Sequence, residues 1–114
     1  MDFKLYKNNN LKIFKNNIAY FKKHDKILFV ADNEHFSISI KNNYLDLEKE
    51  NDDSIFKLSL NNSSIKLKKH NITFNILIED ISIKINGNKY IINYKLESDE
   101  ELTTIEIITY NELD

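Results

Sequence analysis

The chain has 114 residues and a formal charge of −2, with 41% hydrophobic and 30% charged residues, a composition typical of one globular domain with its own core. It contains no cysteine, which excludes disulfides, thiolate metal sites and a cysteine nucleophile. Because no apolar run approaches the roughly 18–20 residues of a membrane span, and the first residues lack the pattern of a secretory signal, we expect no membrane partner and an intracellular, reducing compartment.

The first 26 residues change their hydrophobic period. Met1, Phe3 and Leu5 alternate with polar residues, which predicts a strand. At about 100° per residue, the apolar side chains of residues 10–26 then fall on one half of a helix that Asn9 or Asn10 would cap. Five lysines fall together on the opposite side of this predicted helix: Lys12, Lys15, Lys22, Lys23 and Lys26.

Most of the remaining chain is predicted to form strands. A tight turn at residues 32–34 joins the first two, and the Asn-Gly pair at residues 86–87 predicts a hairpin turn with positive φ. Residues 71–80 fit two structures, because their strict alternation favours a strand whereas their place in the order of elements favours a helix. The predicted strands are residues 26–31, 35–41, 44–47, 54–60, 64–69, 80–85, 89–97 and 103–110.

The order strand, helix, three strands can be read twice, over about residues 1–60 and 64–110 of a single domain that spans residues 1–114. This pattern predicts an α+β fold in which two helices lie on one face of an antiparallel sheet.

Three stretches share a layout with a known family: "MDF.L....NLK.F...I.YF.K.D", "ILFVADNEHFSISIKNN" and the run from "SIKLKK" to "TTIEIITYNE". They resemble the N-terminal domain of the Rad-nine subunit of the nine-one-one checkpoint clamp, a sliding clamp related to proliferating cell nuclear antigen. The family's Asn-Ser-Ser-Arg stretch is reduced here to Asn42-Asn43, and its second clamp domain has no counterpart.

This resemblance implies a non-enzymatic DNA-clamp subunit of the checkpoint, DNA damage response type, located in the nucleus. The five lysines of the predicted helix would meet the phosphate backbone of duplex DNA without reading its sequence. Other clamp subunits, or a second clamp domain, would join through edge strands. The resemblance implies no cofactor, no metal and no catalytic residue.

Two alternatives remain open. The lysines equally fit the solvated face of an amphipathic helix, and the protein is then a small β-rich protein–protein interaction module with no nucleic-acid role. Such a module would pair through an edge strand such as residues 103–110 or dock a peptide on its sheet. A monomeric DNA-binding protein that uses the lysine helix outside any ring is the second alternative.

The sequence contains no motif typical of an enzyme. The three histidines lack the spacing of a helical zinc site, and no phosphate-binding loop or nucleophile elbow is present, so we do not expect an enzyme.

Overall fold

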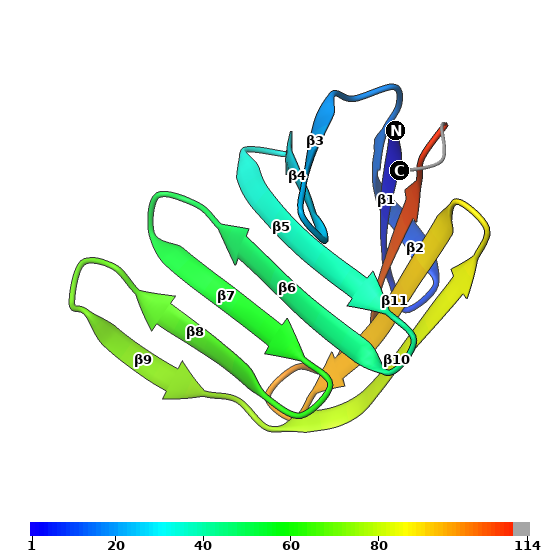
Figure 1. Ribbon diagram of the computed structural model, residues 1–114. Coiled ribbons are helices and arrows are strands. Elements are labelled where there is room, and N and C mark those ends of the chain that lie inside the picture. The colour runs from blue at the N-terminus through cyan, green and yellow to red at the C-terminus, as the bar shows by residue number, and fades with distance from the viewer. Residues whose placement is uncertain (111–114) are drawn as a thin grey trace.

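The computed structural model describes residues 1–110, which form twelve strands and no helix (Figure 1). The strands are β1 (Asp2–Lys7), β2 (Asn10–Lys15), β3 (Tyr20–Lys23), β4 (Lys26–Ala31), β5 (Glu34–Lys41), β6 (Tyr44–Glu50), β7 (Ser54–Ser59), β8 (Ser63–Leu67), β9 (Ile72–Asn75), β10 (Ile78–Asn86), β11 (Lys89–Leu96) and β12 (Thr103–Ile108).

The strands form two antiparallel sheets, each a meander of sequence neighbours. The five-stranded sheet has the order β10-β11-β12-β1-β2, and the seven-stranded sheet runs from β3 to β9 in chain order. Because β12 pairs with β1, the meander closes on itself, and the sheets part only between β2 and β3 and between β9 and β10. The strands of the two sheets cross steeply (Figure 1), as in orthogonal packing, where the chain bends at corners to pass from one sheet to the other.

Backbone hydrogen bonds fix both corners. Between β2 and β3, the amide of Ile18 donates to the Met1 carbonyl at 2.9 Å. Between β9 and β10, the amide of Ile76 donates to the Ser63 carbonyl at 2.8 Å. The chain therefore changes sheet at defined positions.

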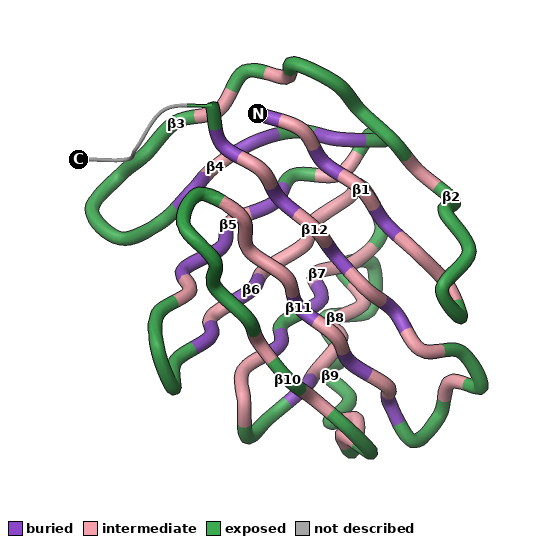
Figure 2. The backbone as a smooth tube through the Cα atoms, turned by 90° about the vertical axis from the view of Figure 1, so that its right-hand side faces the viewer, coloured by how far each residue is buried: buried purple, intermediate pink, exposed green. Residues whose placement is uncertain are grey.

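The space between the sheets is filled by side chains. In Figure 2, buried positions alternate with more exposed ones along β1, β11 and β12, the period of a strand with one face in the core. Phe3 on β1 contacts two rings of the opposite sheet, Phe29 at 5.5 Å and Phe36 at 5.1 Å between centroids. The buried hydrophobic residues are Met1, Phe3, Leu5, Ile27, Phe29, Ala31, Phe36, Ile38, Leu45, Leu47, Phe56, Leu58, Ile92, Tyr94, Leu96, Ile105 and Ile107.

Asparagines form many of the turns. Asn8-Asn9 and Asp32-Asn33 each have two consecutive positive φ angles, as in the type I′ turn that matches the twist of a hairpin. Asparagine tolerates this left-handed region better than most residues because its short amide can bond locally. The asparagines with positive φ are Asn8, Asn9, Asn17, Asn33, Asn43 and Asn71.

The helix expected for residues 10–26 is wrong. The Asn8-Asn9 turn, at the expected helix start, instead folds β2 back against β1. β2 and β3 are sheet edges, where only Ile13 and Tyr20 are even half-buried. Since edge strands meet water on several sides, their two-residue period is weak, and the scattered apolar residues happened to match a helical period.

The α+β fold with two helices on one face is therefore also wrong, since residues 1–110 are all-β. Residues 71–80 contain β9 and the start of β10, so the strand alternative for this segment is confirmed. Residues 103–110 were expected to offer an edge for pairing, but β12 lies between β1 and β11. The expected strands elsewhere are confirmed, and the one at residues 44–47 extends to Glu50.

We predict that Phe3→Ala lowers the free energy of unfolding by about 3–5 kcal/mol, because it leaves a cavity beneath two aromatic rings. Phe14→Ala, at a side chain that is 51% exposed, should lower it by less than about 1 kcal/mol. Urea denaturation of both variants measures the difference. Equal losses would contradict the assignment of Phe3 to the inter-sheet core.

We also predict that Asn9→Val destabilises the protein by about 1–2 kcal/mol, because a β-branched residue is strained at the φ of 66° found there. Asn9→Gly should differ from the natural protein by only a few tenths of a kcal/mol. Asn61→Val is the matched control in an exposed turn outside the positive-φ set. A loss at Asn61 as large as that at Asn9 would exclude backbone strain as the cause.

Candidate functional site

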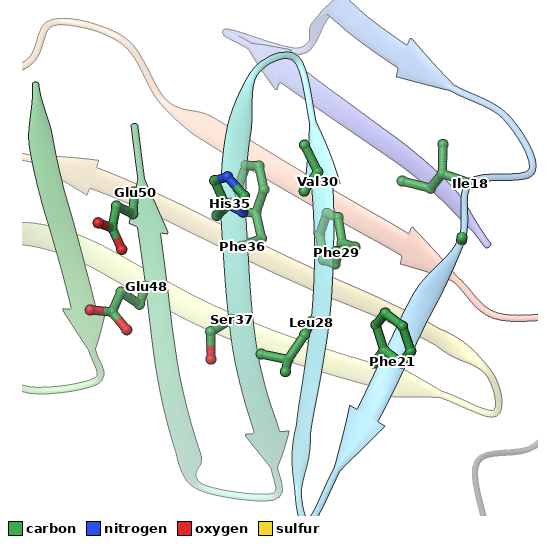
Figure 3. Close-up of a pocket in the computed structure, with 11 residues that line it drawn as sticks. Ile18, Phe21, Leu28, Phe29, Val30, His35, Phe36, Ser37, Glu48 and Glu50 are labelled. Carbon is green, nitrogen blue, oxygen red and sulfur yellow. The ribbon is translucent and has the colours of Figure 1, made fainter. Parts of the chain in front are cut away.

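The outer face of the seven-stranded sheet carries a hollow of about 580 Å³ over β3 to β6 (Figure 3). We call it the outer hollow. A second hollow of about 740 Å³ adjoins it and shares Leu28, Ser37 and Glu48 with it. The side chains that line the outer hollow on this face include Phe21, Leu28, Val30, His35, Ser37, Glu48 and Glu50.

Strand register sets these side chains in two rows. One row crosses the sheet from Phe21 on β3 through Leu28 and Ser37 to Glu48 on β6. The other runs from Val30 on β4 through His35 on β5 to Glu50. These residues alternate with the core positions of the same strands, so the pattern that buries one face aligns the other.

One side of the outer hollow is apolar. The side chain of Phe21 is 76% exposed and that of Val30 is 52% exposed, and Leu28 stands opposite Phe21 in the same row (Figure 3). Single exposed apolar residues are ordinary, but a cluster beside polar groups is typical of an interaction surface.

The other side is acidic. Lys68 donates to Glu50 Oε2 at 2.6 Å, and this hydrogen bond lowers the pKa of the Glu50 carboxyl from its ordinary value of 4.5. Glu48 stands opposite Lys57 on β7, yet within residues 1–110 no ion pair or hydrogen bond engages its carboxylate. The outer hollow therefore combines an open carboxylate with exposed apolar surface.

The row positions also bring a serine, a histidine and carboxylates together, which the sequence analysis missed. Ser37 and His35 lie two residues apart on one face of β5, and His35 is opposite Glu50. Nucleophilic catalysis requires the hydroxyl within hydrogen-bond reach of its base, and in the described residues no hydrogen bond joins Ser37 to His35. Nor do residues 1–110 contain a group of three or more potential metal ligands among His, Cys, Asp and Glu.

The five lysines expected to bind DNA lie on three strands in two sheets instead of on one helix. Lys12 and Lys15 belong to β2 in the five-stranded sheet, and Lys22 and Lys23 to β3 in the other. Lys26 begins β4, with its Nζ 3.9 Å from Asp46. The structure therefore does not gather the five on one element.

No family model matches the chain, and no curated protein or solved structure matches it either. The resemblance to sliding clamps therefore rests only on the three stretches of sequence quoted in the sequence analysis. Within the described part of the chain, no helix is long and apolar enough to span a membrane.

The outer hollow could have been found from the sequence. Residues 26–31, 35–41 and 44–50 alternate, so their non-core positions share one face once the strands are taken as successive hairpins. The acidic strand was expected to end at residue 47, which leaves out Glu48 and Glu50.

We predict that Lys68→Met raises the pKa of the Glu50 carboxyl toward 4.5, measured by carbon NMR of the side-chain carboxyl. A carboxyl with a lowered folded-state pKa contributes stability above its unfolded pKa and loses it as pH falls through the folded pKa. The stability difference between the two proteins should therefore disappear in acid. Lys57→Met is the control, and an unchanged Glu50 titration in Lys68→Met would contradict the pairing.

Proposed function

We propose that the protein is a non-enzymatic interaction module that binds an extended, basic and amphipathic segment of a partner protein in the outer hollow. The observation that carries this proposal is the apolar cluster of Phe21, Leu28 and Val30 beside the unpaired carboxylate of Glu48. An apolar side chain would cover the exposed ring and methyl groups, and an Arg or Lys head would pair with Glu48.

The dimensions of the sheet define the ligand. β4 and β6 are two strand spacings apart, or about 10 Å. In an extended segment, residues two apart share a face and lie about 6–7 Å apart. The long side chain of Arg or Lys spans the remaining distance to Glu48, and its methylene groups lie on apolar surface. The ligand motif is therefore an apolar residue followed, two positions later, by Arg or Lys.

The duplex-DNA clamp hypothesis stays a prediction. It depended on one helix face that gathers the five lysines, and in residues 1–110 those lysines are distributed over β2, β3 and β4. The β-rich interaction module, the alternative to the clamp, is the function that the geometry supports better.

The test is an NMR titration with the blocked peptide Ser-Leu-Ser-Arg-Ser and with its counterpart Ser-Leu-Ser-Glu-Ser. We expect weak binding of the Arg peptide, with shifts concentrated on the amides of Leu28, Ser37 and Glu48, and none from the Glu peptide. Glu48→Gln should weaken the binding by up to about fivefold, the effect of an exposed ion pair worth up to ~1 kcal/mol.

Matched variants decide the outcome. Glu101→Gln, an exposed carboxylate in the loop before β12, should leave binding unchanged. Equal shifts from both peptides, or shifts outside the outer hollow, would overturn the proposal. A short DNA duplex in the same assay that perturbed only β2, β3 and the start of β4 would support the clamp hypothesis instead.

A further inference from the structure

The four sheet edges of the described chain differ in charge. β2 carries two lysines, β3 carries two more, and β10 carries Glu79, Asp80 and Lys84 with a register shift near its start. Charges and bulges of this kind protect edges from pairing with other chains. β9, with the sequence ITFN, has no charged residue. It is the unprotected edge.

The backbone of β9 is oriented for pairing. The Ile76 amide donates to the carbonyl of Ser63, the first residue of β8. Since alternate residues of an antiparallel strand bond to opposite sides, Ile72 and Phe74 direct their backbone groups to β8, whereas Thr73 and Asn75 direct theirs to the open edge. The open edge thus offers two donors and two acceptors in line.

The side chains of β9 on the core side are incompletely covered. Phe74 stands opposite Ile65, which stands opposite the buried Phe56, so all three lie on the inner face of the sheet. Phe74 is nevertheless 50% exposed and Ile72 is 45% exposed. β9 lies at the far end of its sheet, away from β11 and β12 (Figure 1). An added strand would cover this surface.

We propose that the occupant is a second copy of this chain, joined by antiparallel β9–β9 pairing about a two-fold axis, so that two seven-stranded sheets become one. A two-fold interface sets the same strand against itself, so only an edge without like charges avoids repulsion. Self-pairing of β2 or of β3 would bring lysines of the two copies close together. Self-pairing of β9 would instead bring Ile72 and Phe74 close to the same apolar residues of the second copy.

The nearest charged side chain on the adjacent strand does not oppose this pairing. Lys66 on β8 stands opposite Thr73. In the dimer it would lie three strand spacings, or about 14 Å, from its counterpart, beyond the Debye length of about 8 Å at physiological salt. β9 is not one of the strands that carry the outer hollow, so this inference is independent of the proposed function.

The test is sedimentation velocity of the full chain over a range of concentrations. We expect a dimer that is half formed near about 100 µM, the weak range of a small interface. Thr73→Pro removes an outward amide that β8 does not use, a change that an edge strand tolerates. Phe74→Ser removes the apolar contact. Each should weaken the dimer by at least about tenfold.

Phe14→Ser is the matched control, because Phe14 is 51% exposed on the edge strand β2, and it should leave the dimer unchanged. Hydrogen exchange of the Thr73 and Asn75 amides in the natural chain should slow as its concentration rises, which tests the pairing even if Thr73→Pro unfolds. A chain that stays monomeric at millimolar concentration would overturn the inference. So would a dimer that survives Phe74→Ser, or one that Phe14→Ser weakens equally.

Discussion

The contact of Phe3 with Phe29 and Phe36 is the constraint on which the rest of the structure depends. Phe3 belongs to the five-stranded sheet and the other two rings to the seven-stranded sheet, with Phe29 and Phe36 stacked at 4.9 Å. Aromatic rings at such separations contribute attraction beyond the burial of their area. Because β1 also pairs with β12, this cluster ties both ends of the meander to the opposite sheet and closes the fold.

The two sheets close around a core of packed side chains, and this limits the surfaces on which a partner could bind. Side chains occupy the space between the sheets, so the surfaces open to a partner are the outer faces and the four edges. The outer hollow uses side-chain complementarity over β3 to β6, whereas β9 offers backbone groups at the other end of the same sheet. Since β7 and β8 separate them, the partner segment proposed for the outer hollow and the second copy proposed for β9 would not compete for the same surface.

The sequence predicted strands well where one face is buried, as along β4, β5, β11 and β12, because burial imposes a strict alternation. It failed at edges such as β2 and β3, where water reaches both faces and the alternation weakens. Asn9 was expected to cap a helix, but with Asn8 it forms a hairpin turn in which both residues have positive φ. The outer hollow was not predicted because the acidic strand was expected to end at residue 47, before Glu48 and Glu50, so the pairing of His35 with Glu50 was missed.

Nuclear Overhauser spectroscopy of the ring protons tests the closed all-β arrangement most directly. The account predicts cross-peaks from the Phe3 ring to the rings of both Phe29 and Phe36, because the centroids lie within 5.5 Å. It also predicts strand-type contacts between the backbones of β1 and β2. Continuous amide-to-amide contacts through residues 10–26, with no cross-peak from Phe3 to either ring, would show a helix in that segment and contradict the account.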